Sequence, residues 1–469
     1  RTTMHKILPL LAGTLLLTSC GLFGHYERDT KGVDSLTQKL YRDPAQVDAA
    51  LTTTDTASFG NMPWQQVFTD AKLQALIRKA LVQNTDLRKT ALTIKQAEIG
   101  LRVNKLAYLP QIAFSPSGTL SKAFIDGSSL TKTYNFPVQA SWQIDAFGTL
   151  YNAKKQGELS LVQAKVARQA TQTAIVTGVA NLYYSLQMLD EQIATTRSTL
   201  VLWHKNITAM EAMKEAGMTN AAALASAKAQ VLQIESTVPT LEDNIRQLEN
   251  SLAVLLHEVP HAIDRNPFTA DGFPTTFSTG VPLSLLANRP DVAIAEAKLA
   301  STFYGVQAAR GQFFPQITIS GQGAFTNSLG GMIMNPGKFL ASGIASLTQP
   351  LFAQGKIKAG YEVAKLQQEA AQLDFEQALL TAGQEVSNAL AAYHTACTTT
   401  DIAQLRLREL QKANDDTEFL FRNGNTTSYL ETLTAQMNLL NGRLSLINNR
   451  YDKVQAVIKL YQALGGGRQ

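Results

Sequence analysis

The sequence predicts an α+β chain in which one structural unit occurs twice. Three observations support this prediction. Short motifs recur at a nearly constant distance, runs of alternating apolar and polar residues follow the first motif of each copy, and very long helical patterns follow those runs. Each copy is therefore expected to contain a helix, two β-strands and a long helical hairpin.

The repeated motifs set the expected segments of the chain. Asp86 precedes Pro110-Gln111-Ile112 by 24 positions, and Asp291 precedes Pro315-Gln316-Ile317 by the same 24, which places the copies 205 residues apart (291 − 86). This period is far longer than that of a solenoid, so it indicates an internal structural duplication. The expected segments are a lipoprotein signal peptide over 1–19, a lipidated extension over 20–62, a first repeat over 63–262, an inter-repeat linker over 263–283, a second repeat over 284–464 and a flexible tail over 465–469.

Two strands are predicted in each repeat. In the first repeat the apolar faces are Ile112, Phe114, Gly118 and Leu120, and then Tyr134, Phe136, Val138, Ala140, Trp142 and Ile144. In the second repeat the first strand has the apolar face Ile317, Ile319, Gly321, Gly323 and Phe325. The fourth run, Phe339–Leu351, alternates poorly and is predicted from its position in the repeat. Pro116 and Pro137 each remove a backbone donor, so local irregularity is expected at both.

The strand pattern favours a membrane. Each run has about 10 to 13 residues, and a tilted strand crosses a bilayer with about 9–11. An apolar and a polar face are typical of a barrel strand between lipid and a wet lumen, although a half-buried soluble sheet has the same periodicity. Open edges are not tolerated in lipid, so four strands per chain require several chains. Eight strands would be filled by their own side chains, so a conducting pore favours three or more chains.

The beginning of the chain predicts export and lipidation. His5 and Lys6 precede the apolar segment Ile7–Leu17, and Leu17-Thr18-Ser19-Cys20 has the form of a lipoprotein cleavage site. Cys20 is therefore the expected lipidation site; a plain signal peptide with a chance cysteine is the alternative. No later apolar run reaches the length of a membrane helix, and Cys397 then stands alone, so no structural disulfide is expected.

The helical patterns are unusually long. Asn152–Ala216 covers 65 residues (216 − 152 + 1) and would measure roughly 100 Å. Gly217 begins a turn, and Ala221–Leu256 returns. The second repeat runs from Lys356 to Phe421, turns at Gly424 and returns from Ser428 to Leu464, while Trp64–Tyr108 and Pro290–Gln312 are the shorter helices that begin the repeats. Helices of this length need partner helices, so a helical tube attached to the strands is expected.

Several segments resemble one known family. They are Leu285-Leu286-Ala287-Asn288-Arg289-Pro290-Asp291-Val292, Phe313-Phe314-Pro315-Gln316-Ile317, Ser141-Trp142-Gln143-Ile144-Asp145-Ala146-Phe147-Gly148, Gln384-Glu385-Val386, and Ser428-Tyr429-Leu430-Glu431-Thr432-Leu433-Thr434-Ala435-Gln436. Taken in their order along the chain, they resemble the TolC-type outer-membrane efflux proteins, in the lipoprotein branch often called NodT-like.

The resemblance implies both an architecture and partners. It implies a homotrimer whose twelve-stranded β-barrel, with four strands per chain, is continuous with a long α-helical periplasmic barrel. It further implies a periplasmic adaptor protein, an inner-membrane pump of the resistance-nodulation-division type, and lipid of the Gram-negative outer membrane. The chain itself would be a passive, gated exit duct for drugs or other small toxic compounds, with no catalytic residue and no cofactor.

The resemblance also suggests gate residues. Glu431 is the candidate for an acidic ring at the closed periplasmic tip, with Phe421 as an apolar or aromatic constriction; a solvated helix charge is the alternative for Glu431. Relatives often have Asp-Ala-Gln-Arg where this chain has Thr434-Ala435-Gln436-Met437, so Thr434 replaces the acidic half of a charged latch. Gly217 and Gly424 mark the expected adaptor-facing tips of the two hairpins.

Three functions remain open from the sequence: an efflux duct, a duct for type I protein secretion, and a periplasmic metalloprotease. The protease rests on His257-Glu258-Val259-Pro260-His261, which matches the zinc pattern H-E-x-x-H. Pro260 would break the helix on which both imidazoles must lie, so no metal site is predicted there. The formal charge of +5 comes from scattered residues without interleaved aromatics, so no nucleic-acid partner is predicted.

Overall fold

The computed structural model describes residues 24–28, 59–122, 130–270, 273, 289–326, 338–424 and 429–467. They fall into two compact units. The strand unit includes Leu92–Lys165, Ile294–Gln377 and the N-terminal residues, and the hairpin unit includes Val166–Ala293 and Ala378–Gln469 together with residues before Leu92. The signal peptide, Cys20 and most of the predicted linker lie outside the described residues.

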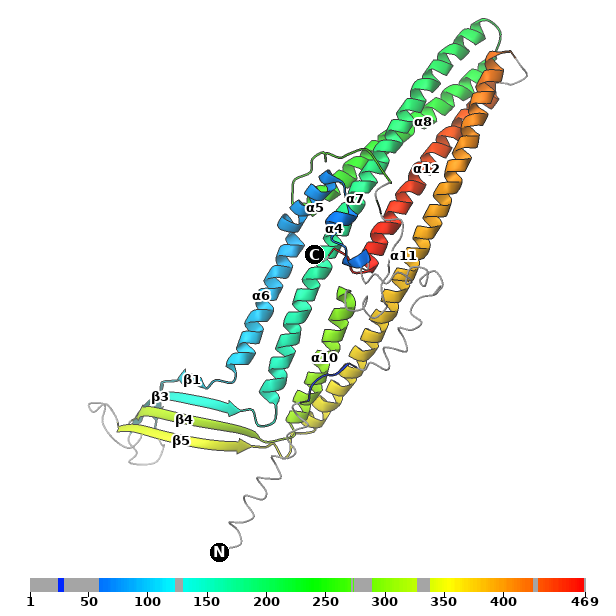
Figure 1. Cartoon of the computed structure of the whole chain (residues 1–469). Helices are drawn as coiled ribbons and strands as arrows, with labels where there is room; N and C mark the ends of the chain where they lie inside the picture. Colours follow the sequence, from blue (N-terminus) through cyan, green and yellow to red (C-terminus); the bar gives the residue numbers. More distant parts are fainter. Residues whose placement is uncertain are drawn as a thin grey trace. The chain divides into compact units, whose positions relative to one another are not determined.

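The strand unit contains one antiparallel sheet. Its strands are β1 Gln111–Phe114, β2 Ser117–Ser121, β3 Thr131–Ile144, β4 Gln316–Thr326 and β5 Lys338–Thr348. The order is β1-β3-β4-β5 (Figure 1). β2 also pairs with β3, on the same side as β1. The strands of both halves of the chain therefore meet in the centre of the sheet, where β3 pairs with β4.

The strand register gives the sheet one apolar face and one polar face. Trp142 lies opposite Ile319, and Phe325 lies between Phe136 on β3 and Phe339 on β5. On the other face, glutamine opposes glutamine and serine opposes serine in the pairs Gln139–Gln322 and Ser141–Ser320. The predicted faces of β3 and β4 are confirmed. The poor alternation of β5 also has a cause, because Ile344 lies on the polar face opposite Ser320.

The two strand prolines behave differently. Pro116 separates β1 from β2, as expected. Pro137 does not interrupt β3, so the predicted irregularity is wrong there. The Pro137 carbonyl accepts a hydrogen bond from the Ser115 backbone N–H at 3.3 Å. The N–H that Pro137 lacks would also point toward β1 and β2, where Pro116 already interrupts the strand. The hydrogen bonds between β3 and β4 therefore lose no donor.

The helix that was predicted over Trp64–Tyr108 is three helices. They are α4 Trp64–Val67, α5 Ala71–Gln83 and α6 Thr85–Leu106, and the short 3-10 turn η2 Phe59–Asn61 precedes them. Asp70 accepts hydrogen bonds from the backbone of Lys72 (2.8 Å) and Leu73 (3.3 Å) and so caps α5. The Asn84 side chain does the same for α6. Each capping side chain accepts hydrogen bonds from the first backbone N–H groups of a helix, so a new helix begins after it. The spacing of apolar residues continues across these breaks, so periodicity alone does not show them.

The remaining helices come in pairs of equal length. α7 Thr149–Glu215 and α11 Lys356–Arg422 each have 67 residues, α8 Ala221–Leu255 and α12 Tyr429–Ala463 each have 35, and α6 and α10 Pro290–Gly311 each have 22. The predicted long helices are confirmed to within a few residues. In the part of the chain that the structure describes, no helix is long and apolar enough to cross a membrane.

Two of the sequence motifs meet inside the hairpin unit. Arg289 is 6% exposed and donates to both carboxylate oxygens of Asp291, to Glu385 at 2.7 Å and to the Ala463 carbonyl at 2.8 Å. Burial alone would lower the pKa of Arg289, but Asp291 and Glu385 more than offset burial and raise it. This side chain therefore joins the start of α10 to α11 and to the end of α12.

The end of α12 is not a free tail over its first residues. Gly465, Gly466 and Gly467 are buried. The hydroxyl of Thr173 donates to the Gly466 carbonyl at 2.7 Å, and Gln172 donates to the Gly467 carbonyl at 3.1 Å. The prediction of a flexible tail is wrong for these three buried glycines, because the carbonyls of Gly466 and Gly467 bind the chain to α7.

Candidate gate and helical hairpins

Each hairpin turns at a glycine in the left-handed conformation. Gly217 follows α7 and Gly424 follows α11, and both have φ of +72°. After α7 the Met218 N–H donates to the Met213 carbonyl at 2.8 Å, which closes the helix end in the way that glycine favours. No heavy atom lies within 4 Å of a Cβ built on either glycine, so backbone conformation, not space, requires glycine there.

The three candidate gate residues lie close to the second turn. Phe421, near the end of α11, is half-buried, while Glu431 and Thr434, at the start of α12, are exposed. The Thr434 hydroxyl donates to the Leu430 carbonyl at 2.8 Å, within its own helix. Thr432 and Leu433 between them are buried. Glu431 and Thr434 therefore project away from the side of α12 that packs on the other hairpin.

The tip region has its own apolar core. Trp203 and Met210 of α7 are almost fully buried and pack with residues of α8 and α12, among them Leu224 and Leu440. Sequence periodicity predicted the helices but not this cluster, because the cluster depends on which helices are neighbours.

A ladder of charged pairs connects α7 to α8. Arg197 contacts Glu242 at 2.5 Å, His204 contacts Glu235 at 3.0 Å, and Glu211 contacts Lys228 at 2.6 Å. Each step of seven residues along α7 matches a step of seven in the opposite direction along α8. This is the register of an antiparallel coiled coil with heptad spacing. The His204 rung is an ion pair only when the imidazole is protonated.

The next step of the ladder places two carboxylates opposite each other. Seven residues before Arg197 is Asp190, and seven after Glu242 is Glu249. Arg265, from the segment after α8, bridges them: its Nε and Nη2 contact Asp190 at 2.5 and 2.8 Å, and its Nη1 contacts Glu249 at 2.6 Å. Hydrogen bonds with Asp190 and Glu249 raise the pKa of Arg265 despite its burial. Arg265, from the segment predicted as the inter-repeat linker, thus neutralises the two facing carboxylates. Each such level of facing side chains is called a rung of the ladder.

The same positions of the second hairpin carry different chemistry. Positions are counted here from the first residue of each helix. Arg197 and His204 stand at positions 49 and 56 of α7, and Gln404 and Gln411 stand at the same positions of α11. Positions 22 and 15 of α8 hold Glu242 and Glu235, whereas positions 22 and 15 of α12 hold Arg450 and Arg443. Arg443 donates to the Gln411 amide oxygen at 3.0 Å. The ion pairs of the first hairpin are therefore replaced by neutral glutamines facing arginines.

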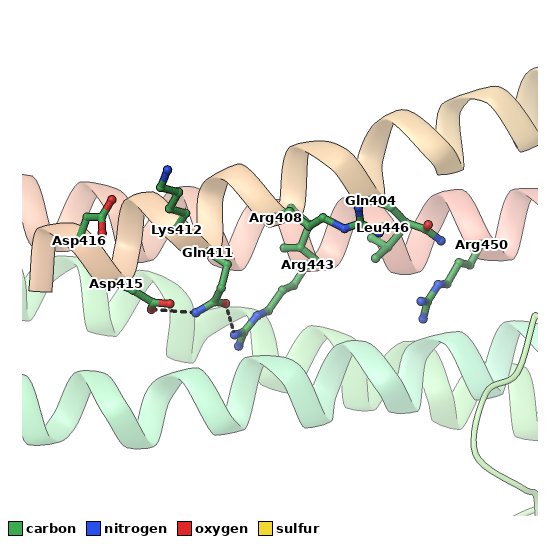
Figure 2. Close-up of a pocket in the computed structure, with 10 residues that line it drawn as sticks. Gln404, Arg408, Gln411, Lys412, Asp415, Asp416, Arg443, Leu446 and Arg450 are labelled. Atoms are coloured by element: carbon green, nitrogen blue, oxygen red, sulfur yellow. Dashed lines mark hydrogen bonds between the residues drawn. The ribbon is translucent and has the colours of Figure 1, made fainter.

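These side chains line a groove between α11 and α12 (Figure 2). Its volume is about 830 Å³, and ten residues line it. Its four cations are Arg408, Lys412, Arg443 and Arg450, and its two acids are Asp415 and Asp416. Figure 2 shows Gln411 between Arg443 and Asp415, to which Gln411 donates at 2.9 Å. Among the described residues, none of the four cations has a carboxylate oxygen within 4 Å.

The H-E-x-x-H segment lies beyond the end of its helix. α8 ends at Leu255, and His257 has a left-handed φ of +60°. Glu258 pairs with Lys79, and the His261 ring faces the Val259 carbonyl at 2.9 Å. The two imidazoles therefore do not share a helical face. Across the described ranges, no group of three His, Cys, Asp or Glu side chains could hold a metal ion.

Comparison with known proteins assigns the family. The model of the family described as "Outer membrane efflux protein" matches residues 76–257 and 281–466, which is well over half of the chain. The chain belongs to the outer membrane efflux protein family. The resemblance seen in the sequence motifs is confirmed, and the chain is an outer-membrane protein that acts in efflux.

Individual relatives match along most of their length. The cation efflux system protein CusC of Escherichia coli O6:H1 (strain CFT073) is 28% identical over 465 residues, which cover 99% of each chain. The toluene efflux pump outer membrane protein TtgC of Pseudomonas putida is 29% identical over 422 residues, with 86% of this chain and 85% of TtgC covered. The open-state structure of the Neisseria gonorrhoeae MtrE outer membrane channel superposes with a TM-score of 0.80 at 24% identity, covering 89% of this chain and 94% of MtrE.

Proposed function

We propose that this outer membrane efflux protein is the passive, gated exit duct of a tripartite efflux system. The observation that carries the proposal is the two-faced sheet. On its apolar face Phe136, Trp142 and Phe339 are between 43% and 62% exposed in the single chain. Such a face is satisfied by lipid, while the glutamine and serine face suits a water-filled lumen. The chain then crosses the outer membrane through its strands.

Closure of the barrel calls for further copies of the chain. Among the described strands of one chain, β5 pairs with β4 alone, and β1 and β2 form the other edge of the sheet. Beside the β1 edge, α6 exposes a heptad-spaced stripe, Leu92, Ile99, Val103 and Leu106. Beside the β5 edge, α11 exposes a second stripe, Val363, Leu366 and Leu373. In a closed ring of chains, the β1 edge of one chain pairs with the β5 edge of the next. This pairing would bury the exposed apolar residues of α6 against those of α11.

Three copies give the assembly that these features favour. Because β1 and β2 both pair with β3 on the same side, they count as one interrupted strand, and three chains supply twelve strands. Twelve strands leave a wider bore than eight. The equal lengths of α6 and α10, of α7 and α11, and of α8 and α12 support an internal duplication. A homotrimer would then present six similar hairpins, which extend the twelve-stranded barrel into a helical periplasmic tube.

Lipidation of Cys20 fits the path of the N-terminal residues. Tyr26 packs on Phe303, and Arg28 pairs with Glu296, so the chain runs along α10 away from the sheet. Cys20 precedes Gly24 by four residues, which span at most about 14 Å. From Phe303 to the end of α10 is about 12 Å. A lipid anchor on Cys20, which lies outside the described residues, is compatible with these lengths.

The gate is proposed at the tip of the second hairpin. Three copies of Glu431 around a narrow axis repel one another and concentrate cations, with Phe421 and Thr434 beside them. The turns at Gly217 and Gly424 would face a periplasmic adaptor protein. An inner-membrane pump of the resistance-nodulation-division type would load the substrate into the duct.

The substrates are proposed to be drugs or other small toxic compounds. The names of the relatives refer to cations and to toluene, and both are small solutes. A duct with a polar lumen needs no tight binding site for them, so selectivity is assigned to the pump.

Conductance in a planar bilayer tests this function. The native trimer should form a pore of small conductance, and Glu431→Ala should change its conductance and lower its preference for cations. Glu409→Ala, at an exposed position of α11 away from the turn, is the matched control and should behave like the native protein. A pore that Glu431→Ala leaves unchanged would refute the gate residue but keep the duct; well-folded trimers without a pore would refute the duct.

A further inference from the structure

The two hairpins differ in where their charges are neutralised. In the first ladder, Glu242, Lys228 and Arg265 supply the counter-charges of Arg197, Glu211 and the facing pair Asp190 and Glu249. Glu235 gains a counter-charge when His204 is protonated. At the equivalent positions of the second hairpin, Arg443 donates to the neutral Gln411, and Arg450 lines the groove together with Gln404. Glu191 of α7 acts electrostatically on Arg450, and Asp415 reaches Arg443 only through Gln411, but neither carboxylate lies within 4 Å of an arginine.

The groove gathers these arginines with two more cations. Arg408 and Lys412 lie on the α11 wall, so the four cations outnumber Asp415 and Asp416 by two (4 − 2). Positive side chains that share one groove raise the local potential and attract an anionic partner. Arg443 and Arg450 are seven residues apart on α12, which corresponds to about 10.5 Å along the helix.

We propose that the groove between α11 and α12 is a docking surface for an α-helix of a partner protein that carries carboxylates seven residues apart. The heptad spacing of Arg443 and Arg450 matches one flank of a helix lying along the groove. Its carboxylates complete the rungs that Gln404 and Gln411 leave without a counter-charge, as Glu242 and Glu235 complete those of the first hairpin. This inference rests on the proposed function, in which a periplasmic adaptor binds the hairpins, and it specifies the chemistry of the adaptor surface.

A pair of peptides tests the proposal on the full-length trimer in detergent. The probe is a fluorescent 28-residue helical peptide with Glu at every seventh position, and its counterpart has Gln at those positions. Binding is measured by fluorescence anisotropy. The Glu peptide should bind at least tenfold more tightly than the Gln peptide, and this difference should shrink as NaCl is raised, because salt screens exposed charge pairs.

Two groove variants and one control locate the binding. Arg443→Gln combined with Arg450→Gln removes the cations, and Gln404→Glu combined with Gln411→Glu neutralises them from within the chain. Each double variant should weaken binding of the Glu peptide at least tenfold. Arg406→Gln, on α11 but outside the groove lining, should change it less than twofold.

Several results would overturn the proposal. Equal binding of the two peptides, or groove variants that bind like the native protein, would show that charge at these rungs does not select the partner. Displacement of the peptide by inorganic phosphate at low millimolar concentration would make the groove a site for small anions. Concentration-dependent pairing of trimers that the Arg443 and Arg450 variant abolishes would make the occupant a second copy. A bilayer pore in the same preparation would leave the proposed duct intact in each case.

Discussion

The two helical hairpins have the same lengths and turn at glycines with the same φ, yet they are held together differently. α7 and α8 are joined by charged pairs at heptad spacing, and the rung with two carboxylates is bridged by Arg265. α11 and α12 present glutamines and arginines at the matching rungs and leave a groove of about 830 Å³. The difference teaches that hairpins with the same backbone arrangement can neutralise their charged side chains within the chain or leave arginines available to a partner.

The largest effect is expected in the apolar core of the first hairpin. Trp203 is 1% exposed, and Leu410 occupies the same position of α11 but is only half-buried. Trp203→Ala should lower the free energy of unfolding by about 4 kcal/mol because it leaves a large cavity, whereas Leu410→Ala should cost about half as much. Hydrogen exchange of α8 and thermal unfolding measure both. Equal losses would mean that the two hairpins do not differ in core packing.

Removal of Arg265 should have the next largest effect. Arg265→Ala leaves Asp190 opposite Glu249 without a cation, and loss of one member of this partly buried charge network should cost about 2 kcal/mol, less than for a fully buried pair. Asp190→Asn in the same background should recover part of that loss, because one of the two facing charges is removed. Thermal unfolding measures both changes, and Arg246→Ala, at an exposed position of α8, is the control. If Asp190→Asn brought no recovery, the like-charge rung would not explain the role of Arg265.

Exchange of single rungs should produce small effects of opposite sign. Arg197→Gln gives the first hairpin the chemistry of the second and should cost about 0.5 kcal/mol, because exposed ion pairs contribute little. Gln404→Glu gives the second hairpin an Arg450 ion pair and should add a similar amount. Thermal unfolding at low and at high salt measures both changes, which should vanish at about 1 M salt. A change that persists at high salt would indicate packing rather than charge.

The smallest effect concerns Glu191, which faces the second hairpin. Burial raises the pKa of Glu191 from its usual 4.5, and Arg450 acts against that rise. The folded state therefore disfavours the charged carboxylate, and this cost to stability is present at neutral pH and disappears as pH falls through the raised pKa. Glu191→Gln should slightly raise the midpoint of thermal unfolding at pH 7 and leave it unchanged near pH 4. A gain of equal size at both pH values would rule out titration of Glu191 as the cause.

Local patterns in the sequence predicted much of this fold. Alternation gave the faces of β3 and β4, and the helical patterns that turn at Gly217 and Gly424 gave the long helices to within a few residues. Both patterns are short-range, because side-chain direction along a strand or helix follows from its period. The breaks at Asp70 and Asn84 were missed, since capping side chains divide a helix without disturbing its apolar phase.

The candidate site was predicted less completely. Glu431, Phe421 and Thr434 could be placed at the second turn by resemblance, but the ring proposed for them would need further copies of the chain. The ladder had a signal that could have been found, namely the seven-residue spacing of Arg197, His204 and Glu211. Its partners could not be fixed from that spacing alone, because many antiparallel registers of two long helices place some opposite charges together.

By itself, the sequence determined the helix and strand periods, the glycine turns and the membership of an efflux family. Only the tertiary structure decided which charges meet: Arg265 between Asp190 and Glu249, Arg289 between Asp291 and Glu385, and Arg443 against Gln411. The physical reason is that a period is set by neighbouring residues along the chain, whereas a charge pair is set by the register of helices that are distant in sequence and is fixed by the packing of the whole unit.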